Sequence, residues 1–254
     1  GTGAVALAAG SQLTLGGAAS SSFAGSFGGD GGLVKQGAGT LTLTGSSSHG
    51  GGTTVAGGVL AVLADAALGA AGSPLTLDGG SLRATGGATV ALAPQRSLSV
   101  GSVGGTLAVD AGTTLQVQGP LDGSGPVTKA GAGTLALAGA NPAFQGAVQV
   151  SAGTLALQHA AALGAANPVD LAAGSTLDLG LDVRLGPLSG SGAVQLHGFT
   201  LATGGASSVF SGTLDGGGVL QLLGGGQLTL AGATGFTGST QVLGGTLALA
   251  DADA

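Results

Sequence analysis

The 254-residue sequence contains no Cys, Met, Trp, Tyr, Ile or Glu, and only 2% of its residues are aromatic. The absence of Cys excludes disulfides and thiolate chemistry and leaves the cellular compartment open. Five Lys and Arg residues stand against eleven Asp, for a net charge of −6. Basic patches supply most of the affinity for nucleic acid and anionic lipid, so we expect neither partner. No run of about 18 apolar residues is present, so we expect no membrane-spanning helix.

Glycine and small aliphatic residues are abundant instead. The chain has 57 Gly and is 43% hydrophobic, with a mean hydropathy of +0.55. Disordered chains have low hydrophobicity, and collagen needs Gly at every third position with abundant Pro, so both classes are excluded. The chain begins at Gly1 without Met, and its first residues do not have the pattern of a signal peptide. We therefore expect a fragment or a processed form.

Short segments in which Leu or Val alternates with Thr, Ala or a polar residue are typical of half-buried strands. They comprise residues 5–7, 13–15, 41–43, 75–77, 107–109, 115–117, 135–137, 155–157, 177–179, 228–230 and 247–249. Gly, Ser, Asp and Asn separate them and favour turns. Helical patterns are confined to residues 65–71 and 159–164, each expected to form a single turn at a corner.

One motif recurs three times, with offsets of 94 residues from Gly39 to Gly133 and 93 from Gly133 to Gly226. The copies read Gly37-Ala38-Gly39-Thr40-Leu41-Thr42-Leu43-Thr44-Gly45, Gly131-Ala132-Gly133-Thr134-Leu135-Ala136-Leu137-Ala138-Gly139 and Gly224-Gly225-Gly226-Gln227-Leu228-Thr229-Leu230-Ala231-Gly232. Self-similarity at a fixed period indicates a solenoid or array. A β-sandwich needs aromatic core residues, and six Phe are too few. We predict an all-β parallel solenoid of about a dozen turns, at roughly 20 residues each, and a rod ~60 Å long.

The motif resembles the passenger-associated repeat of bacterial autotransporters. In each copy a turn follows it, at residues 48–55, 141–150 and 234–242, and then a Gly-x-Leu strand begins at Gly58, Gly153 or Gly245. His49, Phe144 and Phe236 stand where the family has Tyr, and Pro142 lies inside one turn. The resemblance implies a right-handed parallel β-helix at the surface of a Gram-negative cell, exported through the periplasm and outer membrane, with a C-terminal translocator β-barrel in the parent chain. We interpret residues 1–254 as one continuous passenger segment with repeat cores near 37–62, 131–157 and 224–249.

No catalytic, cofactor-binding or metal-binding residues are predicted. Asp122-Gly123-Ser124-Gly125-Pro126 is superficially similar to a serine-protease nucleophile loop, but its frame recurs at residues 186–192 without the Asp, which favours a turn. His49, His159 and His197 lack partners at metal-ligand spacing and are interpreted as surface or turn residues. Asp30 is not part of an iterated calcium-binding nonapeptide. The Gly-x-Gly pairs lack the third glycine of a nucleotide cradle. The Ser runs 20–22 and 46–48 are interpreted as solvated turns, with sugar attachment or glycan binding as the alternative.

The sequence therefore favours a structural stalk that supports secretion, folding and adhesion or display, and that is not an enzyme. The alternative is a self-associating adhesin or fibre subunit, joined through solenoid faces or ends. A β-helix enzyme acting on polysaccharide or protein is the third possibility, weakened by the absence of Glu. The partners expected are further copies of the chain, or a host or bacterial surface glycan or protein, with no nucleic acid and no direct membrane insertion.

Overall fold

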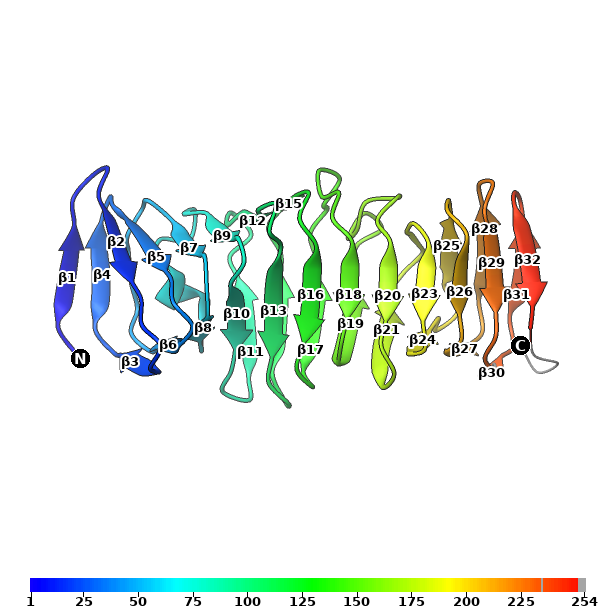
Figure 1. The fold of residues 1–254 in the computed structure, drawn as a ribbon, viewed down its shortest axis with the longest axis horizontal. Coiled ribbons are helices and arrows are strands. Elements are labelled where there is room, and N and C mark those ends of the chain that lie inside the picture. The colour runs from blue at the N-terminus through cyan, green and yellow to red at the C-terminus, as the bar shows by residue number, and fades with distance from the viewer. Residues whose placement is uncertain (234, 251–254) are drawn as a thin grey trace.

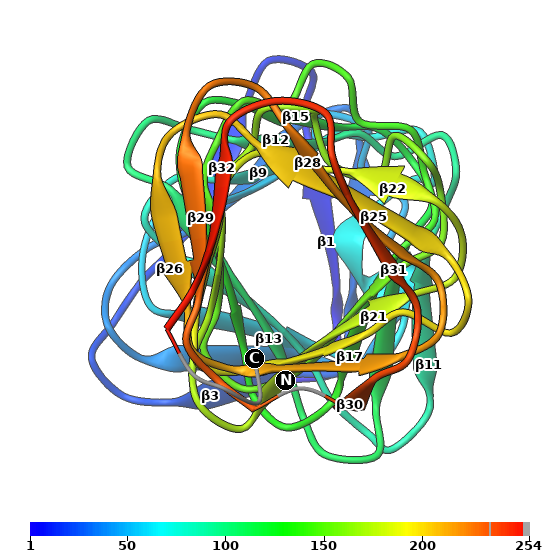
Figure 2. The same ribbon diagram turned by 90° about the vertical axis from the view of Figure 1, so that its right-hand side faces the viewer.

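The computed structural model describes residues 1–233 and 235–250. Thr234, which belongs to the turn of the third repeat copy, and residues 251–254 lie outside the described residues. The chain coils about one long axis into an elongated rod of about twelve turns, with β1 at one end and β32 at the other (Figure 1). Viewed from the C-terminal end, the chain circles a central core anticlockwise as it approaches the reader, so the helix is right-handed (Figure 2). The prediction of a right-handed, all-β parallel solenoid is confirmed.

The strands stack into five parallel sheets that line the sides of the rod. The largest contains β3 (Ser21–Phe23), β6 (Thr40–Leu43), β8 (Val59–Val62), β10 (Ser81–Ala84), β13 (Gly105–Val109), β16 (Val127–Ala130), β18 (Val148–Val150), β20 (Val169–Leu171), β23 (Leu188–Gly190), β26 (Ser208–Phe210), β29 (Gln227–Leu230) and β32 (Thr246–Leu249). The second contains β11 (Thr89–Leu92), β14 (Thr114–Val117), β17 (Thr134–Leu137), β19 (Gly153–Leu157), β21 (Ser175–Leu179), β24 (Ala193–Gln195), β27 (Thr213–Gly216) and β30 (Gly235–Phe236).

The remaining sheets are shorter. The N-terminal half holds β2 (Gln12–Leu15), β5 (Gly32–Lys35), β7 (Thr53–Val55), β9 (Leu75–Leu77), β12 (Leu98–Val100) and β15 (Leu121–Gly123). The C-terminal half holds β22 (Val183–Arg184), β25 (Thr200–Gly204), β28 (Val219–Leu223) and β31 (Ser239–Val242), and β1 (Ala4–Leu7) pairs with β4 (Ser26–Gly29).

The aliphatic residues of successive turns pair in register and fill the centre of the rod. In the second sheet Leu115, Leu135, Leu155 and Leu177 are directly stacked and no more than 1% exposed. Because side chains alternate across a strand, the intervening residues lie on the opposite face, where Gln116 and Asp178 are half-buried and Ala136 and Ala156 are 2% and 7% exposed. The period-2 pattern thus identified the Leu-lined core face correctly, although these two Ala are shielded from solvent as well.

Each repeat core is a module of two stacked turns. Its Gly-x-Gly-x-Leu strand pairs directly with the Gly-x-Leu strand that follows one turn later, which places Leu41 on Leu60, Leu135 on Leu155 and Leu228 on Leu247. The first and third modules lie in the largest sheet and the second lies in the eight-stranded sheet. The copies are therefore equivalent in local structure, although they do not all occupy the same side of the rod.

The paired glycines of the motif have two different backbone roles. The first one, Gly37, Gly131 or Gly224, has a positive φ of 69°, 78° or 89°. The second one has no room for a side chain: a Cβ on Gly39, Gly133 or Gly226 would lie 2.2–2.3 Å from a carbonyl oxygen of the preceding turn. These glycines are corners that let adjacent turns approach closely.

Helix is nearly absent from the described residues. The segment expected to turn at residues 65–71 forms the 3₁₀ helix η1 (Asp65–Leu68), whereas residues 159–164 form a turn closed by Ala162 N donating to His159 O (2.9 Å). Within the described part of the chain, no helix has the length and apolar character needed to cross a membrane.

Candidate functional site: the repeat modules

A buried lysine clamps the two turns of the first and second modules. Lys35 and Lys129 are 3% and 0% exposed, and each precedes its Gly-x-Gly pair by two residues. The ammonium of Lys129 donates to Ala130 O (3.1 Å) and Gly131 O (2.7 Å) of its own turn, and to Ala152 O (2.9 Å) of the next. Three N–H donors thus meet three carbonyl oxygens, and one side chain fastens two turns.

The clamp of Lys35 has the same design. Its ammonium donates to Gln36 O (2.7 Å), Gly37 O (2.9 Å) and Gly57 O (3.0 Å). Burial lowers the pKa of Lys35, and it lowers that of Lys129 to about 8. In the third module Leu222 takes this position and is 2% exposed. The site accepts either an ammonium with three acceptors or an aliphatic side chain.

The turns of the modules are held by different buried groups. In the second module Asn141 Oδ1 accepts from Leu121 N (2.7 Å) and Nδ2 donates to Ala162 O (2.7 Å). In the first module His49 Nε2 hydrogen-bonds Thr53 Oγ1 (2.9 Å). Asn141 thus links neighbouring turns directly, whereas His49 acts through Thr53, whose Oγ1 donates to Leu68 O (3.2 Å), 15 residues further along the chain.

Arg96 fastens the η1 loop that covers the first module. Its buried guanidinium pairs with Asp65 (Nε to Oδ1, 2.6 Å) and donates through Nη1 and Nη2 to Leu68 O, Ser73 O and Gly69 O. All donors of the side chain are used within the fold. Arg96 therefore stabilises a loop and does not face a ligand.

His49 lies in the loop between β6 and β7, as expected of a turn residue, but it is not at the surface, because the structure buries it completely. It stands two residues before Gly51, as Phe144 and Phe236 stand before their glycines, and so takes the place of an inward-facing aromatic ring. Phe144 is also buried, and its backbone bridges to Gly123. Burial, and in addition the positive charge of Arg96, lower the pKa of His49.

His197 is not isolated either. It is exposed with φ 51°, and its Nε2 lies 2.7 Å from Asp178 Oδ1, 19 residues earlier in the chain. One turn of the rod contains about that many residues, so the two side chains stand next to each other on adjacent turns. His159 is half-buried, and its Nδ1 accepts from Ala161 N (3.0 Å).

The structure does not bring the remaining candidates together. Asp122 accepts a hydrogen bond from Ser99 of the previous turn, and in the described part of the chain no histidine hydrogen-bonds Ser124. Asp30 is exposed. Across residues 1–233 and 235–250, no group of three or more His, Asp, Cys or Glu side chains is placed to hold a metal ion.

The serine runs lie at the surface, and two of their hydroxyls accept backbone hydrogen bonds. Ser20 Oγ accepts from Thr40 N (3.4 Å) and Ser47 Oγ from Phe27 N (3.1 Å). Longer outward columns come from strands: Thr89, Thr114, Thr134, Thr154 and Thr176 stand in register on five consecutive turns. These columns present hydroxyls at regular intervals, and nothing in the described residues converts them into a pocket.

Comparison with known proteins agrees with the geometry. The model of the passenger-associated-transport-repeat matches residues 33–62, 127–157 and 220–249, so each match contains one two-turn module with its clamp position. The chain is also similar to the adhesin BmaC autotransporter of Brucella suis biovar 1 (strain 1330), with 42% identity over 153 residues. The chain carries three passenger-associated transport repeats.

The aligned region covers 60% of this chain and 4% of the Brucella protein, so the passenger segment corresponds to a small part of that relative. No solved structure matches the chain significantly. Autotransporter passengers are displayed on or secreted from Gram-negative cells, and this is the location of the segment.

Proposed function

We propose that residues 1–254 form one continuous, non-enzymatic stalk that supports secretion and folding of the passenger and holds an adhesive surface away from the cell. The proposal rests on the in-register stacking of strands along the described rod. The buried side chains of Lys35 and Lys129 reinforce this stacking by joining one turn to the next. In such a stack each turn contacts only its neighbours, so stability is added turn by turn. A chain emerging from a pore can therefore fold progressively.

The similarity to a protein named an adhesin supports an adhesive parent chain. If the segment is a stalk, a substitution in its core should act first on surface display, and adhesion should follow the amount displayed. In cells expressing the parent protein, a core substitution such as Leu135→Asp should reduce the amount of protease-resistant passenger at the surface, and adhesion should fall in proportion. Flow cytometry with an epitope tag measures display, and attachment assays measure adhesion. Undiminished display of the variant would refute the stalk.

Self-association is the second candidate. Along the sides of the rod Val103 and Val209 are 69% and 55% accessible, and these apolar side chains are available to a second copy of the chain. A fibre subunit should show a sedimentation coefficient that rises with protein concentration. A single monomeric species over a hundredfold range would exclude this role. If the chain turned over a polysaccharide or protein substrate, and one Asp or Ser substitution abolished this activity, the segment would be an enzyme and not a stalk.

A further inference from the structure

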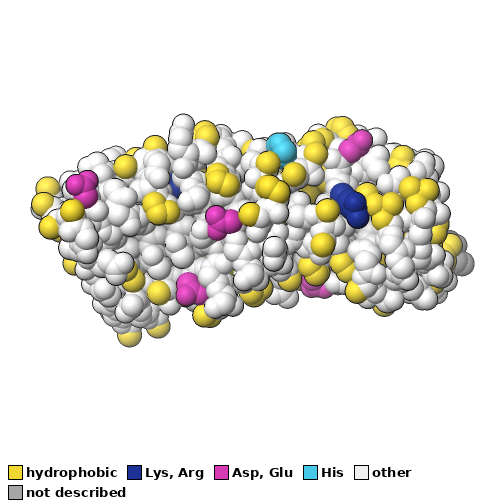
Figure 3. Space-filling model, turned by 90° about the horizontal axis from the view of Figure 1, so that it is seen from above, with side chains coloured by type: hydrophobic (Ala, Val, Ile, Leu, Met, Phe, Trp, Pro, Cys, Tyr) yellow, Lys and Arg dark blue, Asp and Glu magenta, His cyan; other side chains and the backbone are white. Residues whose placement is uncertain are grey.

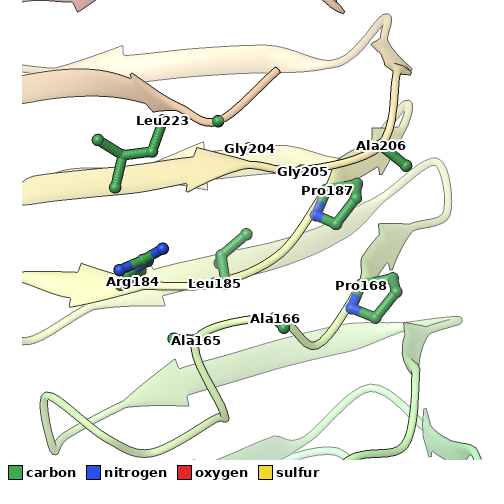
Figure 4. A pocket seen from close by; sticks show the side chains of 11 residues that line it. Ala165, Ala166, Pro168, Arg184, Leu185, Pro187, Gly204, Gly205, Ala206 and Leu223 are labelled. Carbon is green, nitrogen blue, oxygen red and sulfur yellow. The ribbon is translucent and has the colours of Figure 1, made fainter. Parts of the chain in front are cut away.

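A groove of about 410 Å³ follows one corner of the rod across four successive passes of the chain (Figure 4). Its walls include Pro168, Pro187, Leu185 and Leu223, and glycines at the third and fourth passes leave it open. It adjoins a second groove of about 390 Å³, with which it shares Ala165 and Ala166. Three steps between turns, at about 4.8 Å each, give a length of roughly 14 Å.

Arg184 is the one charged residue in the lining of this groove, and it is exposed. The other four cations are engaged inside the fold or at its surface: Lys35 and Lys129 in their clamps, Arg96 with Asp65, and Arg83 with Asp110 (2.8 Å). Arg184 makes no side-chain hydrogen bond or ion pair with any described residue. On the face shown in Figure 3, charged side chains are few and lie apart.

We propose that this groove binds an extended, acidic and aliphatic peptide segment of a partner protein, with a carboxylate of the peptide paired to Arg184. Pro168, Pro187 and Leu223 are accessible and favour aliphatic side chains, which lose water on binding, whereas Leu185 is 1% exposed and belongs to the core beneath the groove. The length fits about four residues of extended chain at roughly 3.3 Å per residue. A carboxylate meets no opposing Asp in the lining, so the charges are complementary.

The same lining disfavours a glycan. Sugar hydroxyls need many hydrogen-bonding partners, and a hydroxyl desolvated without one is costly. Arg184 is the only side chain with a polar group among the residues that line the larger groove. A peptide has fewer polar groups per unit of length to satisfy, and its aliphatic side chains use the apolar walls.

The experiment selects phage-displayed random heptapeptides on the folded chain and counter-selects on Arg184→Gln. Enriched peptides should combine aliphatic residues with Asp or Glu. In fluorescence anisotropy their affinity should fall about tenfold for Arg184→Gln and weaken as salt rises from about 50 to about 500 mM. Ala206→Phe, which fills the groove at an exposed position, should also abolish binding. Arg83→Gln, a cation on another strand, is the matched control and should bind normally.

Absence of enrichment, or equal binding by wild type, Arg184→Gln and Ala206→Phe, would overturn the proposal. Polygalacturonate and sialyllactose are tested in parallel, and Arg184-dependent binding of either in place of peptide would assign the groove to a glycan instead. This inference adds a binding role to the proposed stalk. Because it is measured on the isolated chain, its failure leaves the display results unaffected, and a failed display assay leaves it intact.

Discussion

The alkaline titration of Lys129 tests the buried clamp directly. Burial lowers the pKa of this side chain from 10.5 to about 8. A base with a lowered pKa in the folded state binds fewer protons folded than unfolded between those two values, so stability should rise with pH from about 8 to about 10.5. At about 1.36 kcal/mol per pH unit, the gain in the free energy of unfolding is about 3 kcal/mol.

The composition of the chain leaves few side chains that titrate in this alkaline pH range. Tyr and Cys are absent, and Lys35 and Lys129 are the only lysines. The pKa of Lys35 is lowered by burial as well, so its contribution has the same sign. An alkaline rise in stability is therefore assigned to two side chains with the same structural role.

The assay is urea denaturation followed by far-UV circular dichroism between about pH 7 and 11. Lys129→Leu, which copies Leu222 of the third module, should lose about 3 kcal/mol of the alkaline rise. Lys35→Leu is the matched control and should keep the part that belongs to Lys129. A flat profile for the wild type, or an unchanged rise in Lys129→Leu, would mean that the lysine is not held in a dry environment.

Three further substitutions test the core, the corners and the buried histidine. Leu135→Asp places a carboxylate among the stacked aliphatic side chains of the core and should lower the melting temperature strongly. Thr134→Asp, on the outward face of the same strand, should change the melting temperature by only a few degrees. Equal effects of the two substitutions would mean that the inward and outward faces are assigned wrongly. Gly133→Ala should destabilise by about 1–3 kcal/mol in urea, while Gly225→Ala, with open space around its Cβ and Ala at the same place in the other copies, should be neutral or stabilising by about 0.4–1 kcal/mol. Because the pKa of His49 is lowered, the free energy of unfolding should fall as pH drops below about 6.5, and His49→Phe should remove that dependence; an unchanged acid profile would contradict the burial argument.

The fold could be predicted from the sequence because each strand carries its own burial pattern. Alternation of Leu with Thr or Ala identifies the inward face within a few residues, and Leu135 is buried as its neighbours predict. The glycine corners are equally local, since Gly37 and Gly131 adopt the positive φ that their spacing suggests. Local patterns of this kind are independent of the unequal lengths of the turns.

Contacts between turns were not predictable in the same way. Arg96 and Asp65 are 31 residues apart, and turn length varies from 17 residues between Leu177 and Val194 to 25 between Leu82 and Leu107. The pairing of His197 with Asp178 depends on the same unknown lengths. The clamps did leave a signal: Lys35 and Lys129 are 94 residues apart, the offset of the repeat itself, and this marks them as part of the module.

A buried lysine is an expensive way to join two turns, and Leu222 demonstrates that an aliphatic residue fits the position. We infer that the lysine is useful because it fixes the register, that is, which turn stacks on which. Turns of similar sequence can slip by one turn against each other and still bury their leucines, since a parallel stack of near-identical strands specifies register weakly. Lys129 lies in the Leu107–Val150 ladder and is satisfied only where its three carbonyl acceptors converge. A slipped stack would leave its charge among aliphatic side chains, at a cost of several kcal/mol. We therefore expect a variant with leucine at both clamp positions to refold into several stacks, visible as multimodal hydrogen exchange, whereas a single exchange envelope would refute the role in register.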